Sequence, residues 1–140
     1  MGEIPGIPLP RLYDWNRPYF QAAAAGRLVL QKCRACGALI YYPRPACPDC
    51  LAMEYDWVPV SGRGHIYSFA IVWRPQHPAF NDRVPITLAT ITLEEGPQMV
   101  SNIVNAPPER VEIGLPVRVV FERITNEIAL PKFELAEAPP

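Results

Sequence analysis

Four cysteines carry the clearest chemistry in this sequence. They form two pairs, Cys33 with Cys36 and Cys47 with Cys50, and two residues separate the members of each pair. Two cysteines at this spacing in a tight turn direct both thiolates at one ion, and two such turns complete a tetrahedral site. Four thiolates leave no position for water, so we expect one structural zinc ion per chain. Iron in a rubredoxin-like electron carrier uses the same ligands and is the alternative.

No recognisable set of catalytic side chains accompanies the cysteines. His65 and His77 are the only histidines, and neither has an acid or a nucleophile at a spacing that suits joint catalysis. There is no Ser-His-acid set, no paired-carboxylate signature and no glycine-rich phosphate loop, and the four cysteines are committed to the metal. We therefore expect no catalytic residue and no catalytic activity from the chain alone.

The elements that must position these residues are mostly short strands. Apolar and polar residues alternate in the segment from Val117, where Val119 and Phe121 share one face and Arg118 and Glu122 the other. Glu95-Gly96-Pro97 has the composition of a hairpin turn. Five strands are predicted, at 64–73, 86–94, 97–104, 117–124 and 130–135, with 55–60 as a lead-in. The fold class is all-β, with a five-stranded barrel.

A helix and a small ribbon precede the predicted barrel. Pro18 suits a first helical turn and Gly26 a helix end, which predicts a helix near 16–25. Its aromatic residues either pack on the β domain or dock on a partner, and the docking candidates are Trp15, Tyr19 and Phe20. The predicted divisions are an extended segment and helix at 1–27, a zinc ribbon at 28–54, a barrel domain at 55–136, which the family resemblance described below implies is an OB-fold, and a disordered tail at 137–140.

Composition limits the classes of function. The chain has 140 residues, 13 basic and 14 acidic side chains and a net charge of −1, which gives no field that would hold it on nucleic acid or an anionic membrane. No export signal and no apolar run of about 18 residues is present, so we expect a cytoplasmic protein, in which paired cysteines bind metal more readily than they form disulfides. A single-stranded nucleic-acid-binding OB-fold module is the alternative function.

The chain resembles, nearly from end to end, the DUF35 family of small proteins with a rubredoxin-like zinc ribbon and an OB-fold. The order and spacing of several segments carry the resemblance: Tyr19-Phe20 through Ala25-Gly26-Arg27-Leu28, Cys33-Arg34-Ala35-Cys36-Gly37, Tyr42-Pro43-Arg44-Pro45, Cys47-Pro48-Asp49-Cys50, Trp57 with Val60-Ser61-Gly62-Arg63-Gly64, Pro85 to Leu93 with Glu95-Gly96, and Ile113-Gly114-Leu115-Pro116-Val117. Leu51 departs from the family pattern, which commonly has glycine or a small residue there, and His65 stands where a small polar residue is usual.

The resemblance implies an accessory subunit in acyl-CoA metabolism. Family members associate with thiolase-like enzymes, including lipid-transfer-protein-type aldolases, or with MaoC-type hydratases, and help to hold the acyl-CoA. The implied partner is thus a thiolase-like or MaoC-like chain in a hetero-oligomer that shares the acyl-CoA ligand. The roles that the resemblance suggests for such a complex include steroid or lipid side-chain metabolism. No nucleic acid or membrane is an expected partner.

An acyl-CoA ligand carries phosphate charges, so its groove needs Lys or Arg donors beside an apolar channel. Arg44, which stands between two prolines, is the preferred candidate. The candidate acyl-CoA-binding residues are Lys32, Arg34, Arg44, Arg63 and Arg74.

Overall fold

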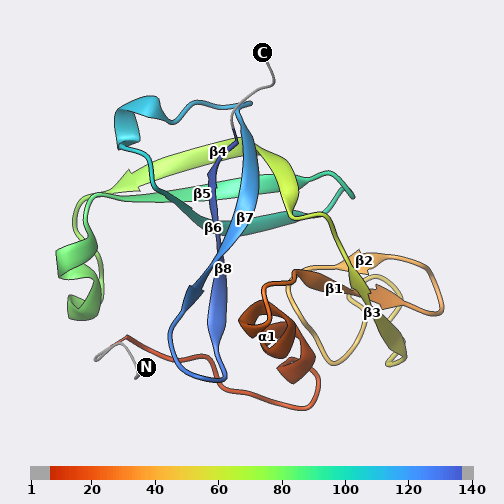
Figure 1. Cartoon of the computed structure of the whole chain (residues 1–140). Helices are drawn as coiled ribbons and strands as arrows, with labels where there is room; N and C mark the ends of the chain where they lie inside the picture. The colour runs from red at the N-terminus through yellow and green to blue at the C-terminus, as the bar shows by residue number, and fades with distance from the viewer. Residues whose placement is uncertain (1–6, 137–140) are drawn as a thin grey trace.

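A closed five-stranded barrel forms the C-terminal part of the chain in the computed structural model, which describes residues 7–136 (Figure 1). Its strands are β4 (Arg63–Val72), β5 (Ile86–Leu93), β6 (Gln98–Val104), β7 (Pro116–Arg123) and β8 (Ala129–Leu135). They lie in the order β4-β5-β6-β8-β7, and all neighbours are antiparallel except β6 and β8. The predicted all-β OB-fold class is confirmed, and each predicted strand matches within two residues.

Alternation along the strands builds the core of the barrel. In β5, buried Thr87, Ala89, Ile91 and Leu93 alternate with more exposed residues, because successive side chains point to opposite faces. Ile66, Ile91 and Phe133 have no exposed surface and form the centre of the core. Between β5 and β6, the backbone N–H of Gly96 donates to the carbonyl of Leu93 at 2.9 Å, which confirms the predicted hairpin turn.

Helix α1 (Arg17–Ala24) lies against the lower end of the barrel and contacts β8 (Figure 1). Its C-terminus ends where Gly26 adopts a φ of +82°, a conformation that glycine reaches without a steric penalty. A barrel residue also caps this end, because Nη2 of Arg123 donates to the carbonyl of Ala24 at 2.7 Å. The predicted helix at 16–25 is therefore confirmed to within one residue at each end.

A three-stranded sheet stands beside the barrel and carries the cysteines. It consists of β1 (Val29–Cys33), β2 (Leu39–Ile40) and β3 (Tyr55–Pro59), in the order β2-β1-β3. The sequence analysis placed 55–60 at the start of the OB-fold domain, whereas β3 pairs along its whole length with β1, and Gln31 lies opposite Trp57. The chain therefore leaves the ribbon sheet only after Pro59 and enters the barrel at β4.

Two short 3₁₀ helices, which the sequence analysis did not anticipate, connect barrel strands. They are η1 (Pro78–Arg83), between β4 and β5, and η2 (Pro108–Arg110), between β6 and β7. Nδ1 of His77 accepts a hydrogen bond from the backbone N–H of Ala79 at 3.0 Å, so this histidine caps η1. Within residues 7–136, no helix is both long and apolar enough to cross a membrane. The predicted tail at 137–140 lies outside the described residues.

Candidate metal centre and ligand-binding residues

The four cysteine sulfurs converge on one point at the end of the ribbon sheet. All four Sγ atoms lie within 4.8 Å of one another. Sγ of Cys33 is 3.5 Å from Sγ of Cys50, and Sγ of Cys36 is 3.7 Å from Sγ of Cys47. A tetrahedral ion with Zn–S bonds of about 2.3 Å requires sulfurs about 3.8 Å apart. The thiols are therefore spaced to hold one metal ion.

Two turns of the same design position the sulfurs. Each turn begins at a buried cysteine, Cys33 or Cys47, and brings the second cysteine of the pair to the surface. The backbone N–H of Gly37 donates to the carbonyl of Cys33 at 2.9 Å, and that of Leu51 donates to the carbonyl of Cys47 at 2.8 Å. Gly37 and Leu51 both have a positive φ, of 77° and 66°. The two cysteine turns are therefore matched halves of one site.

Backbone hydrogen bonds favour the thiolate form at Cys33, Cys36 and Cys50, but at Cys36 and Cys50 burial and contacts with neighbouring cysteines outweigh them and raise the pKa. A hydrogen bond from the backbone of Cys36 is the main cause that lowers the pKa of the Cys33 thiol to about 7, and the backbone of Ala35 contributes. A lowered pKa favours the thiolate, which is the form that binds metal. Cys33 and Cys47 also form a small apolar cluster with Ile40, which shields one side of the site.

Gln31 links β1 to the segment that precedes the second cysteine turn, and it was not singled out by the sequence analysis. Its side chain is fully buried; Oε1 accepts from the backbone N–H of Arg44 at 2.7 Å, and Nε2 donates to the carbonyl of Arg44 at 2.8 Å. This pair of bonds fixes the segment between β2 and the second cysteine turn. The available signal was a glutamine that follows the apolar run Leu28-Val29-Leu30 on a strand.

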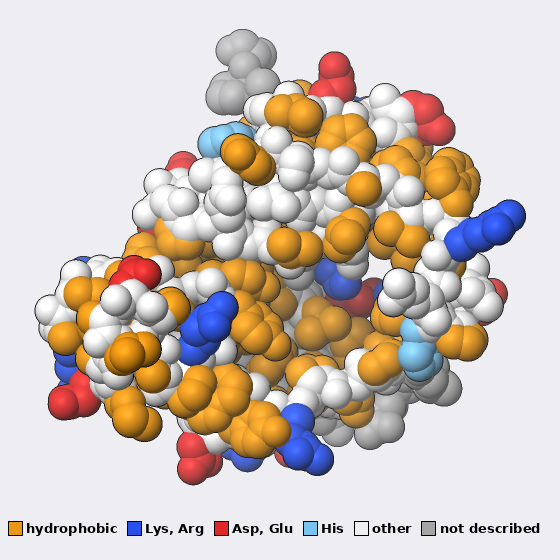
Figure 2. Space-filling model, turned by 180° about the vertical axis from the view of Figure 1, so that it is seen from behind, with side chains coloured by type: hydrophobic (Ala, Val, Ile, Leu, Met, Phe, Trp, Pro, Cys, Tyr) orange, Lys and Arg blue, Asp and Glu red, His pale blue; other side chains and the backbone are white. Residues whose placement is uncertain are grey.

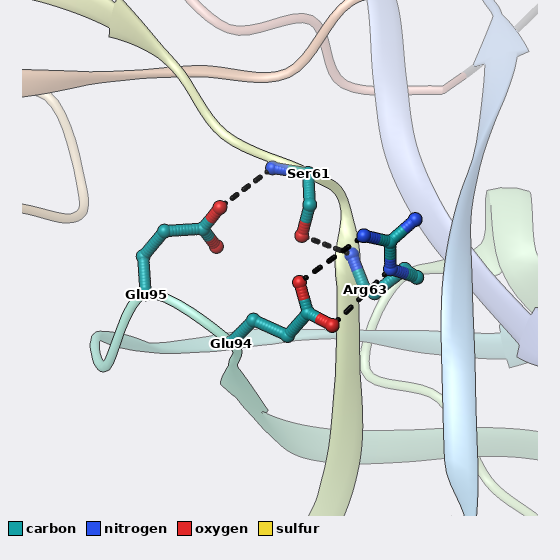
Figure 3. Close-up of polar contacts among 4 residues, drawn as sticks. All are labelled: Ser61, Arg63, Glu94 and Glu95. Atoms are coloured by element: carbon teal, nitrogen blue, oxygen red, sulfur yellow. Dashed lines mark hydrogen bonds and ion pairs between the residues drawn. The ribbon is translucent and has the colours of Figure 1, made fainter.

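Two of the five candidate acyl-CoA ligands are already paired with carboxylates. Arg63 at the start of β4 contacts Glu94, with Nε 3.2 Å from Oε1 and Nη2 3.4 Å from Oε2, and Figure 3 shows this pair beside Ser61 and Glu95. The hydrogen bonds from Arg63 lower the pKa of the Glu94 carboxyl. Arg34 donates from Nε and Nη2 to Asp56 at 3.0 and 2.8 Å, across the β1–β3 pair.

The other three candidates lie on different parts of the surface. Lys32 is exposed on β1, and Arg44 is exposed between β2 and the second cysteine turn, near the ribbon. Arg74 is exposed just beyond β4, at the end of that strand opposite to Arg63. In residues 7–136, no carboxylate lies within salt-bridge distance of these three side chains. The five basic residues are thus spread over the ribbon and both ends of β4.

The aromatic docking candidates are mostly interior. Tyr19 is 4% exposed and Phe20 6% exposed, and both belong to the main hydrophobic core. Of the two alternatives in the sequence analysis, packing on the β domain therefore describes these two residues, and docking through their rings does not. Trp15 is half-buried and stacks on Tyr13 with ring centroids 5.2 Å apart. Burial of the rings follows from the contact between α1 and β8, which the helix sequence alone does not specify.

Two family models match successive parts of the chain. The model described as "ChsH2, rubredoxin-like zinc ribbon domain" matches residues 20–55, and "ChsH2, C-terminal OB-fold domain" matches residues 57–122. The first match contains all four cysteines. The second begins inside β3 and extends into β7.

Individual relatives extend the match. A "DUF35 domain-containing scaffold protein" of Methanocaldococcus jannaschii is 35% identical over 71% of this chain and 71% of its own length. A "Probable enoyl-CoA hydratase alpha subunit" of Thermomonospora curvata is 38% identical over 92% of this chain. The alignment covers only 40% of that relative, so the chain spans less than half its length.

A solved structure agrees with the sequence matches. A chain of the structure described as "Ltp2-ChsH2(DUF35) aldolase" superposes with a TM-score of 0.78 at 37% identity, and the match covers 91% of this chain and 98% of that one. The likeness includes both the ribbon and the barrel, because it covers nearly the whole of each chain. With its cysteine ribbon, its OB-fold and these relatives, the chain belongs to the DUF35 family.

Proposed function

We propose that this chain is an accessory subunit that binds a thiolase-fold or MaoC-type hydratase chain and helps to seat that partner's acyl-CoA thioester. The observation that carries the proposal is the likeness, over almost the full length of both chains, to a component of an aldolase that contains a DUF35 protein. The hydratase name of a 38% identical relative supports the second class of partner and the CoA thioester.

The contribution of the chain in this proposal is positioning. Lys32, Arg44 and Arg74 are exposed and have no carboxylate partner among residues 7–136, so they are the candidates that remain free to contact CoA phosphates. Arg34 and Arg63 would first have to leave Asp56 and Glu94. Arg44 is the preferred contact, since Gln31 fixes its backbone while its side chain extends into solvent.

We also propose that the cysteines hold one structural zinc ion, with Cys33, Cys36, Cys47 and Cys50 as its ligands. The sulfur spacing and the four-thiolate donor set support a tetrahedral ion. When bound, the ion crosslinks the two cysteine turns, and it has no position for a substrate. Metal analysis of the purified chain should give about one zinc per chain with no visible absorbance. A red protein with charge-transfer bands would instead identify iron.

Purification of a tagged chain from its own cells tests the proposed partner. We expect a thiolase-like or hydratase chain to co-purify in stoichiometric amount. The Arg44→Ala variant should retain that partner and the metal but weaken binding of acyl-CoA by the complex, while Arg11→Ala, at an exposed arginine outside the candidate set, serves as the control. Recovery of the chain alone, or with nucleic acid, would contradict the proposal.

A further inference from the structure

Two open cavities meet on the outer surface of the barrel. One, of about 260 Å³, lies between η1 and strands β5 and β6; the other, of about 330 Å³, lies between α1, the segment after β2 and the same strands. Asn102 and Lys132 line both cavities, so the two cavities adjoin at these residues. Figure 2 shows a hollow on this side of the molecule, with blue and red side chains on its floor and orange side chains around it.

The first cavity has an uneven set of charges. Arg83 donates from Nη1 to both carboxylate oxygens of Glu122, at 2.9 and 3.1 Å, and each side chain is only about one-third exposed (32% and 33%). Lys132 donates from Nζ to Oδ1 of Asn102 at 2.6 Å. Within residues 7–136, no carboxylate lies within salt-bridge distance of Lys132. Two cations therefore face one carboxylate, which leaves one positive charge without a counterion.

The surroundings of Lys132 make the absence of a counterion unfavourable. Burial is the main cause that lowers the pKa of the Lys132 ammonium, and nearby Arg83 lowers it further, while Glu122 opposes them. A partly buried cation gains more from a bound anion than an exposed one does, because solvent screens the attraction less. An anion placed between Lys132 and Arg83 would thus meet a charge that the protein does not itself neutralise.

The second cavity is apolar. Its lining includes the rings of Tyr41 and Tyr42 and the side chains of Leu88 and Val100. Tyr42, Leu88 and Val100 are 54%, 42% and 56% exposed, large values for apolar or aromatic residues that lie together. A ligand chain lying along them would remove this surface from water, which is favourable in proportion to the apolar area covered.

We propose that the two cavities form one binding site for a monocarboxylate with an apolar chain, such as a fatty acid. The carboxylate lies at Lys132 and Arg83, and the chain lies along Tyr42, Leu88 and Val100. One excess positive charge matches a monoanion, whereas a phosphate dianion would leave an excess negative charge beside Glu122. The inference rests on this chain alone and requires neither the metal nor the partner subunit.

Calorimetric titration of the metal-loaded full chain with three probes tests the site. Octanoate should bind. Octanamide keeps the chain and loses the charge, so its affinity should be lower by a factor of about ten or more, as expected for loss of a charge-assisted hydrogen bond. Acetate, which keeps the charge and loses the chain, should bind more weakly than octanoate. Equal affinity for octanoate and octanamide, or no octanoate binding, would overturn the proposal.

A matched pair of variants tests the role of Lys132. Lys132→Met should lower octanoate affinity about tenfold or more and leave octanamide affinity unchanged, whereas Arg110→Met, at an exposed cation of η2 outside both cavities, should change neither. Octyl phosphate separates a carboxylate site from a general anion site, since the proposal expects it to bind more weakly than octanoate. An equal loss of octanoate affinity in both variants, or tighter binding of octyl phosphate than of octanoate, would contradict the assignment.

Discussion

Leu51 and Gly37 occupy equivalent positions in the two cysteine turns. Both close a turn with a positive φ, but only glycine adopts this conformation without a clash between Cβ and the backbone. The side chain of Leu51 contributes little packing energy to offset this strain, because the residue is 76% exposed. The departure from the family pattern noted in the sequence therefore coincides with a strained position beside Cys50.

Replacement of Leu51 by glycine should stabilise the metal-loaded chain. Relief of the left-handed conformation outweighs the added entropy of the unfolded chain, so the free energy of unfolding should rise by about 0.5–1 kcal/mol. Denaturant titration measures the change. Leu51→Ala removes most of the side chain yet keeps Cβ, and should show little gain; equal gains from both variants would show that the side chain, not the backbone, is at fault.

Gln31 allows a second prediction at the scale of single residues. Gln31→Leu leaves the backbone N–H and carbonyl of Arg44 without their partners, so the free energy of unfolding should fall by about 2 kcal/mol or more. Chemical denaturation measures the loss. Gln21→Leu, on the exposed side of α1, is the matched control and should change stability by less than about 0.5 kcal/mol. A similar small effect of both substitutions would contradict the role assigned to Gln31.

At the scale of elements, the strands of the barrel were predictable and the pairing of β3 was not. Alternation such as that of Val117, Val119 and Phe121 is a local pattern, and it located each barrel strand within two residues. The sequence of the 55–60 segment also predicts a strand, but this strand can pair either with β1 or with a barrel strand. Local sequence does not determine which of the two it pairs with.

The same limit explains the candidate ligands. The four cysteines were identifiable because their pairs are close in sequence, so spacing alone predicts their geometry. Arg34 and Arg63 find their carboxylates 22 and 31 residues away, and no short-range pattern predicts such pairs. Lys132 is a lysine on a half-buried strand, and its relation to Arg83 arises only when η1 folds beside β8.

The contact between α1 and the barrel also leads to a prediction. Arg123→Met removes the side-chain donor to the last turn of α1, so stability should fall by about 1 kcal/mol and amide hydrogens there should exchange faster. Hydrogen exchange with mass spectrometry resolves the local effect. Arg110→Met, at an exposed arginine of η2, is the control. Unchanged exchange in α1, or the same change in both variants, would rule out the cap.

At the scale of the whole molecule, the ribbon and the barrel have separate means of stabilisation. The cysteine turns contain only a small apolar cluster of Cys33, Ile40 and Cys47. The main core contains barrel residues such as Ile66 and Phe133, together with Leu30 of β1 and the aromatic residues of α1. The metal should therefore stabilise the turns far more than it stabilises the barrel.

Removal of the metal should produce a local change. After chelation, amide hydrogens in residues 33–52 should exchange rapidly, while those of β4 to β8 stay protected, because their core does not depend on the thiolates. The Cys36→Ser variant should reproduce the effect without a chelator. Hydrogen exchange of the two regions measures it, and equal loss of protection in the barrel would show that the fold depends on the metal as a whole.

Reconstitution of the partner enzyme tests the accessory role most directly. The partner chain recovered with this protein is purified alone, and its turnover of an acyl-CoA substrate is measured with and without the metal-loaded chain. The account predicts that the isolated partner is inactive or unstable, that addition of this chain restores turnover, and that the chain alone shows none. Full activity of the isolated partner, unchanged when this chain is added, would contradict the proposed function.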